Sequence, residues 1–541
     1  MKKSSFLRNA FIATAGIIIC KIIGLLYVIP FYSIIGSQGG ALYSYAYSIY
    51  AIFLSLSTSG IPIAISKLVS EYQTMEYYNS KERVYKIGLA LIMTLGIVLF
   101  VLMMLSAPFL AKIILGDLTG GNSVASVTMV IRVISLSLLI VPILSVTKGY
   151  LQGHQMMDSP SKANVIEQLV RVGVIILGSL FAVRVFHTKI DTAVGIAVFG
   201  ATAGAIAAYF YLAMKLHKHK EILHSNAIRT RKEAKITNHV ILKKIIFYAF
   251  PFLVIDLLKS AFSLVDTFTV VNTLTNLGYE ASITESVIGV LTTWGTKLNM
   301  IVVSISLGIS MSLVPSVASS YVEKDMVGVN EKVRDAVQLL LFFCLPMVFG
   351  LSFLSGSVWT IFYGEEMMCA SIFSLFIFQS ITFVLLTILL NITQTINDTR
   401  LAVGTLLFSF ILKAVLNIPV MHVCYFLKIE VYYGPSIATI GAQAIAIFIL
   451  LYVLAKKHRI SLSKSKIVIG KIILSTLIMF MSLKIVGLFI PVAESSRLLA
   501  TIKVIFYTIL GSIIYFVTIG RSGGMKGIFR NLKKDIFFHK D

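Results

Sequence analysis

The stretch IGLALIMTLGIVLFVLMMLSAPFL at residues 87–110 contains no charged side chain. A helix rises about 1.5 Å per residue, so roughly 20 apolar residues cross the roughly 30 Å hydrocarbon core of a bilayer. Comparable apolar runs fill the chain, near residues 10–36, 41–70, 84–110, 123–148, 163–186, 192–214, 245–276, 284–318, 333–356, 367–394, 400–427, 433–455, 466–490 and 497–519. The sequence therefore predicts an all-α polytopic membrane protein with about fourteen transmembrane helices.

The overall composition supports the same class. Apolar residues make up 57% of the 541 residues, charged residues only 13%, and the mean hydropathy is +0.90. Soluble domains average about a quarter charged residues, so this chain lacks the polar surface that water requires. The net charge of +23 would also fit a nucleic-acid-binding protein, but the cations cluster in loops without a basic-aromatic pattern. We therefore expect no nucleic-acid partner and assign the charge to membrane orientation.

The loops between the apolar runs alternate between many cations and few. One set of loops is rich in cations, namely Lys81, Arg83, Lys86, residues 215–244, Lys324, Lys332, Arg334, residues 456–471 and residues 521–541. The other set carries few, namely Lys112, Arg184, Lys189, Lys428 and Arg497. The positive-inside rule then places both termini in the cytoplasm, with the protein in the cytoplasmic membrane. No A-x-A-like cleavage site follows the basic N-terminus, so we expect the first helix to be retained.

Two pairs of short segments indicate an internal repeat. GIPIAISKLVSEY at 60–72 is similar to GISMSLVPSVASSY at 308–321, and YLQGHQMMD at 150–158 is similar to ITQTINDTR at 392–400. For segments this short, chance is an equal alternative. Transporters are commonly built from such repeats, with the substrate between them. The predicted organisation is a six-helix lobe, a basic cytoplasmic linker, a second six-helix lobe, two further helices and a basic cytoplasmic tail, at residues 1–214, 215–244, 245–456, 457–520 and 521–541.

Several cations lie inside the apolar runs. Lys21, Lys297 and Lys413 have no acidic residue within one helical turn, and Arg132 is also deep. An ionised group at the bilayer centre costs at least about 2.5–3.5 kcal/mol, so each needs a partner or water. We predict that these cations line an aqueous cavity. A cavity with surplus positive charge favours an anionic substrate, with phosphate or pyrophosphate as the obvious group.

Other polar residues in the runs have simpler explanations. Glu167 and Arg171 are four residues apart, which favours a local ion pair. For Lys259, a local pair with Asp256 and a place in the cavity are equal alternatives. Three tyrosines at helical spacing could stack on sugar rings, although an interfacial aromatic belt is favoured for them: Tyr43, Tyr47 and Tyr50.

Motifs for nucleotide and metal chemistry are missing from the sequence. It contains no G-x-x-x-x-G-K-[ST], no G-x-G-x-x-G and no H-E-x-x-H, and its four cysteines show no CxxC spacing. We therefore expect a carrier rather than an enzyme, without a cofactor and driven by a sodium ion, a proton or the membrane potential.

Four segments resemble a known family. They are KIIGLLYVIPFYSIIGSQGGALYSYAYSIY at 21–50, GIPIAISKLVSEY at 60–72, GYLQGHQMMDSP at 149–160 and LSGSVWTIFYG at 354–364. They are similar to the polysaccharide-flippase branch of the MATE-like superfamily, and within it to the YtgP/SpoVB group with its MurJ-type lipid II flippases. The resemblance implies two six-helix lobes, alternating access to a central cationic cavity, and two extra helices bordering a groove for the polyprenyl tail.

The resemblance also implies roles for individual residues. Lys21 and Lys297 stand where related proteins have arginines in the first and eighth helices. Asp266, Asn417 and Thr439 match polar positions of a sodium site in the second lobe, and Met421 replaces another ligand of that site. From the residues alone, a solvated carboxylate is at least an equal alternative for Asp266.

The resulting hypothesis is a flippase that moves a lipid-linked precursor of the undecaprenyl diphosphate type, with lipid II first, from the inner to the outer leaflet. An exporter of teichoic or capsular precursors and a drug or cation antiporter are the alternatives within transport. A membrane-embedded glycosyltransferase and a scaffold for division or sporulation proteins are those outside it. Membrane lipids are expected around a monomer, which could associate with proteins of cell-wall synthesis.

Overall fold

The computed structural model describes residues 19–154, 156, 158–218, 236–491 and 496–525. All regular secondary structure within these ranges is helical, so the predicted all-α class is confirmed. The predicted first helix lies partly, and the basic linker and tail mostly, outside the described residues. By packing, the chain forms two compact units, residues 1–288 and residues 289–541.

Twelve helical segments among the described residues are long and apolar enough to cross a membrane. The prediction of about fourteen is close, and two features explain the difference. The first predicted run, residues 10–36, is described only from residue 19, and its second part belongs to α2, which begins at Val28 and is counted in one span with α3. The 39-residue helix α10, Asn238–Asn276, is not among the twelve, and it carries charged residues such as Lys243, Lys244, Asp256 and Lys259.

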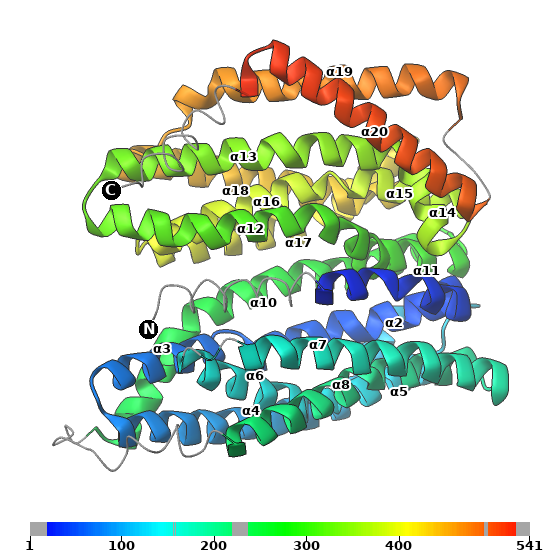
Figure 1. Cartoon of the computed structure of the whole chain (residues 1–541). Coiled ribbons are helices and arrows are strands. Elements are labelled where there is room, and N and C mark those ends of the chain that lie inside the picture. Colours follow the sequence, from blue (N-terminus) through cyan, green and yellow to red (C-terminus); the bar gives the residue numbers. More distant parts are fainter. Residues whose placement is uncertain (1–18, 155, 157, 219–235, 492–495, 526–541) are drawn as a thin grey trace. The chain divides into compact units, whose positions relative to one another are not determined.

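The first unit is a bundle of long helices (Figure 1). Residues 19–26 are helical. They are followed by α2 (Val28–Thr58), α3 (Ile61–Thr74), α4 (Tyr78–Leu115), α5 (Val124–Ser135), α6 (Ser137–Gly153), α7 (Asp158–Gly173), α8 (Ile190–Lys218) and α10, with α11 (Ala281–Gly289) at the boundary. Two π-helical segments, Val174–Gly178 and Phe181–Val185, continue α7. The core of this first unit includes Ile65, Leu68, Val84, Ile92 and Ile245, each at most 1% exposed.

Glycines set the breaks near the start of the chain. The predicted runs 10–36 and 41–70 do not coincide with separate helices, because α2 continues through a kink at Gly36, whose φ is 65°. The next break comes at Gly60, which has φ 78° and stands just before Pro62 near the start of α3. A side chain at Gly60 would collide with the backbone of Ala249 on α10. The glycine therefore permits both the turn and the close approach of α10.

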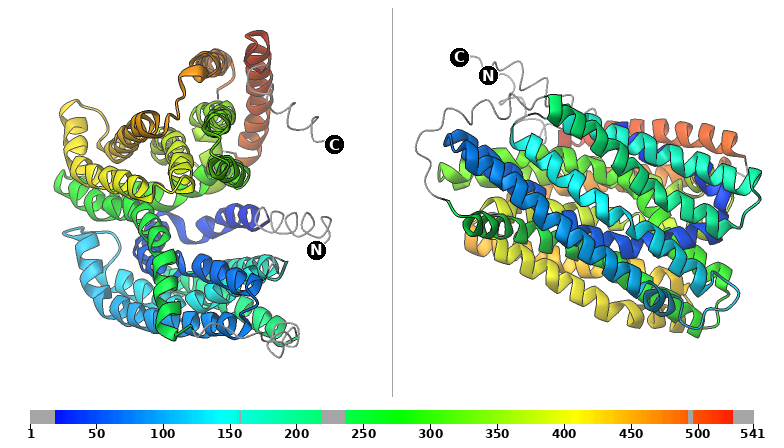
Figure 2. Two further views of the ribbon diagram at one scale, coloured as in Figure 1. Left: turned by 90° about the vertical axis from the view of Figure 1, so that its left-hand side faces the viewer. Right: turned by 90° about the horizontal axis from the view of Figure 1, so that it is seen from below.

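The second unit begins with the π-helical segment Val290–Trp294 and continues through α12 (Gly295–Val322), α13 (Met326–Phe353), α14 (Ser355–Tyr363), α15 (Met367–Phe376), α16 (Gln379–Thr395), α17 (Thr399–Phe426) and α18 (Gly434–His458). The two predicted extra helices are α19 (Lys466–Phe489) and α20 (Arg497–Arg521). Helix α19 packs against α13 and α20, and α20 also packs against α14. Figure 2 shows this unit from two further sides, with α20 in red.

The division by packing differs from the predicted lobe boundary at residues 215–244. Helix α10 follows that linker, yet it packs against α2, α3 and α4 of the first unit. The predicted boundary comes from similar sequence segments, whereas the observed division comes from contacts between helices. The two criteria need not divide the chain at the same residue. The predicted lobe ranges stay a prediction.

Large apolar side chains cover the outside of the helices. Leu105 is 74% exposed, Phe448 is 72% exposed and Phe489 is 82% exposed. Such side chains are unfavourable in water and favourable against lipid tails, so the exposed surface of each unit suits a bilayer.

Candidate functional site

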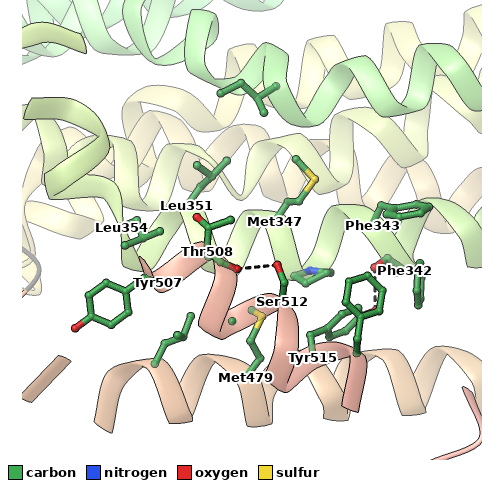
Figure 3. Close-up of a pocket in the computed structure, with 16 residues that line it drawn as sticks. Phe342, Phe343, Met347, Leu351, Leu354, Met479, Tyr507, Thr508, Ser512 and Tyr515 are labelled. Atoms are coloured by element: carbon green, nitrogen blue, oxygen red, sulfur yellow. Dashed lines mark hydrogen bonds between the residues drawn. The ribbon is translucent and has the colours of Figure 1, made fainter. Parts of the chain in front are cut away.

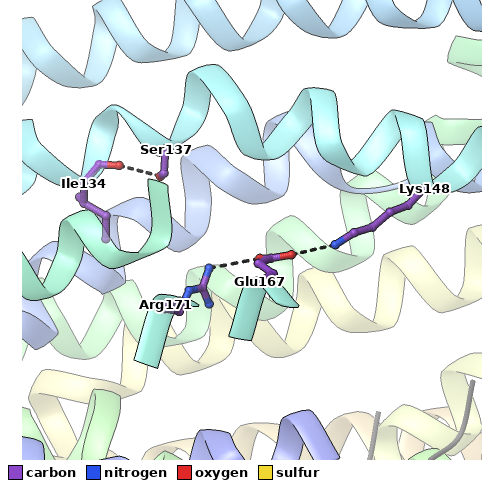
Figure 4. Close-up of polar contacts among 5 residues, drawn as sticks. All are labelled: Ile134, Ser137, Lys148, Glu167 and Arg171. Carbon is purple, nitrogen blue, oxygen red and sulfur yellow. Dashed lines mark hydrogen bonds and ion pairs between the residues drawn. The ribbon is translucent and has the colours of Figure 1, made fainter. Parts of the chain in front are cut away.

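Three charged side chains form an ion cluster in the first unit. Lys148 Nζ on α6 lies 2.8 Å from Glu167 Oε2 on α7, and Arg171 Nη2 lies 3.5 Å from Glu167 Oε1 (Figure 4). The three side chains are 17%, 17% and 25% exposed, in the order Lys148, Glu167, Arg171. Two cations share one carboxylate here, so the cluster keeps a net positive charge. We call Lys148, Glu167 and Arg171 the α6–α7 cluster.

Small residues on α8 fix the backbone that carries this cluster. A Cβ atom at Gly204 would lie 2.5 Å from the backbone oxygen of Glu167, and one at Gly200 would lie 2.9 Å from that of Arg171. Real Cβ atoms do not approach oxygen so closely, so only glycine permits this contact. Helices α7 and α8 therefore pack backbone to backbone, as small residues allow in membrane helices.

The helical residues 19–26 approach the same part of α7. A Cβ atom at Gly24 would lie 3.2 Å from Nε2 of Gln168, next to Glu167. Cys20 lies close enough to Glu167 and Lys148 to interact with them electrostatically. The segment that carries Lys21 is therefore a neighbour of the α6–α7 cluster.

The tyrosines of α2 lie inside the first unit. Tyr43 and Tyr50 are 2% and 3% exposed, and the rings of Tyr43 and Tyr47 stack with centroids 4.4 Å apart. An interfacial belt needs side chains that face the lipid headgroups, so that interpretation is wrong for Tyr43 and Tyr50. All three tyrosines interact electrostatically with the guanidinium of Arg171.

The predicted cavity cations lie in both units. In the first, Lys21 and Lys259 are partly buried and Arg132 is exposed on α5. In the second, Lys297 on α12 is partly buried, and Lys413 on α17 is 1% exposed. The five cations are divided between the two units, and their convergence in one cavity stays a prediction.

The residues of the predicted cation site are buried. Asp266 on α10 of the first unit is 7% exposed, and Asn417 on α17 and Thr439 on α18 of the second are 0% and 3% exposed. Helices α17 and α18 pack together, and Thr439 Oγ1 donates a 2.8 Å hydrogen bond to the Pro435 carbonyl. Within the described ranges, no three His, Cys, Asp or Glu side chains come together as metal ligands. A sodium site stays a prediction.

Lys148 is the residue that sequence reasoning did not single out. It stands at the end of the predicted run 123–148, where a cation is typical of the border of a membrane helix. Its partner Glu167 is 19 residues away on the next helix. The spacing of Glu167 and Arg171 did predict their local pair, and that prediction is confirmed.

The second unit contains an apolar pocket of about 340 Å³ between α13, α19 and α20 (Figure 3). Its walls include Phe343 and Met347 of α13, Met479 of α19, and Tyr507 and Tyr515 of α20. The Tyr515 hydroxyl donates a 2.9 Å hydrogen bond to the Phe342 carbonyl, so this phenol is satisfied within the wall. The lining is therefore mostly hydrocarbon, with Thr508 and Ser512 among its polar residues, and suits an apolar chain.

Comparisons with known proteins place the chain in a family. The profile of the polysaccharide biosynthesis protein family matches residues 6–320, more than half of the chain. The chain is 31% identical over 537 residues to the lipid II flippase MurJ of Bacillus subtilis (strain 168), covering 97% of both proteins. The chain belongs to this family. The predicted resemblance is thereby confirmed, and the chain is a multi-pass protein of the cytoplasmic membrane.

Solved structures show the same fold. A lipid II flippase MurJ in an inward closed conformation matches with a TM-score of 0.68 at 14% identity, covering 97% of this chain and all of that one. An inward-facing multidrug resistance MATE family transporter matches with a TM-score of 0.65 at 12% identity, covering 84% of this chain and 99% of that one. At these identities the matches concern the fold alone.

Proposed function

We propose that this protein translocates lipid II across the cytoplasmic membrane. The observation that carries the proposal is the 31% identity to a lipid II flippase, which covers 97% of both chains. The relatives are named as a flippase and transporters, which supports a carrier rather than an enzyme.

The two ends of such a substrate need different environments, and the chain offers both. The polyprenyl tail would occupy the apolar pocket between α13, α19 and α20, whose walls are mostly hydrocarbon. The diphosphate would bind the membrane-embedded cations Lys21, Lys259, Lys297 and Lys413. Arg132, which is exposed on α5, would be a further ligand. Charge-assisted hydrogen bonds to phosphate are about twice as strong as neutral ones, which favours these side chains as its ligands.

Transport would follow from two arrangements of the lobes that expose the substrate to opposite leaflets. A carrier needs only a modest free-energy difference between two such states, which the substrate shifts by binding them unequally. The membrane potential or a cation gradient would supply the energy, with Asp266, Asn417 and Thr439 as the proposed sodium ligands. Both termini would be cytoplasmic, as the cation-rich loops require. The protein would act as a monomer beside proteins of cell-wall synthesis.

The rival substrates differ in charge or in head group. A drug or cation antiporter would favour acidic groups in the membrane, whereas the α6–α7 cluster retains positive charge. A teichoic or capsular precursor carries the same diphosphate as lipid II. The two classes of lipid-linked glycan are therefore distinguished by the experiment below.

The test is the accessibility of lipid II in the outer leaflet of cells that lack their own flippases and express this protein. We expect the wild-type protein to restore labelling, and Lys21→Ala and Lys297→Ala to abolish it at equal protein levels. Restored labelling of a teichoic or capsular precursor but not of lipid II, by well-inserted protein, would overturn the assignment to lipid II.

A further inference from the structure

In the α6–α7 cluster, the guanidinium of Arg171 has more N–H donors than its contact with Glu167 uses. Within the described part of the chain, Arg171 makes one side-chain hydrogen bond, the 3.5 Å contact from Nη2 to Glu167. Its Nε is buried without a hydrogen-bond partner there. Arginine has five N–H donors in a planar fork, and an unmet buried donor costs about 1–3 kcal/mol. The pairing with Glu167 therefore leaves Arg171 incompletely satisfied.

The carboxylate of Glu167 is shared unequally between its two cations. Its Oε2 accepts a 2.8 Å hydrogen bond from Lys148, whereas the contact with Arg171 is a long single bond rather than a two-point one. A phosphate group matches the guanidinium fork with two parallel hydrogen bonds, which one distant carboxylate oxygen does not. A diphosphate also carries more negative charge than one carboxylate, and it would neutralise the surplus charge of the cluster.

The side chains of the cluster are partly exposed, and the backbone that carries Glu167 and Arg171 is fixed. Its side chains are 17–25% exposed, whereas Lys81, a cation of the same unit, is only 1% exposed. The glycine contacts between α8 and α7 hold the backbone of Glu167 and Arg171 in place. An exchange of partners would therefore require only side-chain rotation.

The cluster also lies at the entrance expected for a substrate from the inner leaflet. Glu167 is nine residues from the start of α7 at Asp158, roughly 14 Å along the helix from the end that the cation-rich loops assign to the cytoplasm. The segment that carries Lys21 packs beside it at Gln168. A diphosphate held here would therefore be near one of the cations proposed to bind it.

We propose that Glu167 is an exchangeable counter-ion. In the empty carrier its carboxylate holds Lys148 and Arg171 in position, and the diphosphate of the substrate replaces it on these cations during loading. When the diphosphate leaves, Glu167 recaptures them and resets the site. This inference rests on the proposed function for its substrate class and adds Lys148, Glu167 and Arg171 to the residues that handle the diphosphate.

The proposal predicts effects of opposite sign within one cluster. The neutral variant Glu167→Gln removes the competitor, so it should tighten diphosphate binding about fivefold or more, the lower end of ordinary coupling between two ligands. Arg171→Gln and Lys148→Gln should weaken binding by a similar factor. In cells, Glu167→Gln should slow lipid II translocation despite its tighter binding, because release is no longer assisted.

The experiment measures the affinity of the purified full-length protein in lipid nanodiscs for inorganic pyrophosphate and for farnesyl diphosphate, together with the melting temperature of each variant. The matched control is Asp158→Asn, which removes an exposed i,i+4 pair with Lys162 from the same helix. It should leave both affinities unchanged. A purely structural ion pair would instead make Glu167→Gln lower the melting temperature and weaken binding in parallel with Lys148→Gln.

The outcomes separate this inference from the proposed function. If the wild type restores lipid II labelling in cells but Glu167→Gln does not tighten diphosphate binding, the inference is overturned and the function stands. If Glu167→Gln tightens binding but lipid II labelling is never restored, the function is overturned and the exchange holds for another diphosphate lipid. Failure of both wild type and Glu167→Gln to bind either probe would overturn the inference.

Discussion

Helices α7 and α17 begin in the two similar segments of the predicted repeat, residues 150–158 and 392–400, and are held in different ways. Each follows a short turn from the preceding helix, begins at or beside an aspartate, and packs against the next helix along the chain. In the first unit, Asp158 pairs with exposed Lys162, and the tie between helices is the salt bridge from Lys148 to Glu167, which lies nine residues into α7. In the second unit, the ion pair between helices lies where α17 begins and α18 ends.

That second tie is an ion bridge from α17 to α18. Asp398 Oδ2 lies 2.5 Å from Lys457 Nζ and 3.0 Å from His458 Nε2, at the last residues of α18. Deeper in α17, Lys413 is buried one turn from Asn417. The comparison shows that two packed helices can carry their charge pair within the helices, as in the first unit, or at their ends, as in the second. We propose exchange with a substrate only for the pair of the first unit, whereas the pair of the second unit holds two helix ends together.

The largest difference between the two units should appear in how their stability depends on pH. His154 directly follows the end of α6, and burial lowers its pKa to about 4 although its Nδ1 hydrogen bonds to the Tyr150 carbonyl. The aligned position in the second unit is the apolar Ile396. Because the folded-state pKa lies below the unfolded value of 6.5, stability is complete above pH 6.5 and falls as the pH drops toward 4.

The loss of folding free energy should reach about 3 kcal/mol near pH 4, since one pKa unit is about 1.4 kcal/mol. Melting temperatures of wild type and His154→Gln between pH 7 and pH 4 measure it, and the variant should lack the slope. An equal slope in both proteins would contradict the assignment to His154.

The next effect concerns the close contact of α7 and α8. Gly204→Ala places a methyl group 2.5 Å from the Glu167 carbonyl oxygen and should cost about 1–3 kcal/mol, as overpacked cores do. In the second unit, a Cβ atom added at Gly441 on α18 would meet open space as far as the described residues extend. Gly441→Ala should therefore be neutral or stabilising, because alanine is the better helix former. Thermal unfolding of the two variants compares the units, and equal losses would refute the difference in packing.

A smaller effect is expected for the ion bridge of the second unit. Hydrogen bonds from Lys457 and His458 hold the pKa of Asp398 below its ordinary value of 3.8. Its contribution to stability is therefore present above about pH 4 and is lost as the pH falls further. Asp398→Asn should cost about 1 kcal/mol at neutral pH, since charged hydrogen bonds at a partly exposed site contribute modestly. A melting temperature unchanged at pH 7 would show that the bridge does not hold α17 to α18.

The smallest effect is expected for the exposed pair of the first unit. Asp158 and Lys162 are 40% and 55% exposed with 3.6 Å between their charged atoms. Exposed i,i+4 pairs contribute about 0.3–0.5 kcal/mol, so Asp158→Asn should barely change the melting temperature. A loss as large as that of Asp398→Asn would remove the contrast between the two helix starts.

Some features followed from local sequence. The pairing of Glu167 with Arg171 follows from a spacing of four on one helix, and α19 and α20 follow from their long, mostly apolar runs. The burial of Tyr43 and Tyr50 did not follow, because an interfacial and an interior tyrosine have the same spacing. The salt bridge of Lys148 joins two helices, so no spacing within either one could reveal it.

The sequence by itself determined the class of this protein and its orientation signal. Apolar runs longer than a bilayer is thick leave the backbone no favourable choice but helices in a membrane, and the cations of the loops are readable residue by residue. Only the tertiary structure decided which charges meet: Lys148 with Glu167, and Asp398 with Lys457 and His458. The physical reason is that hydrophobicity accumulates along one helix, whereas an ion pair between helices depends on which faces pack together.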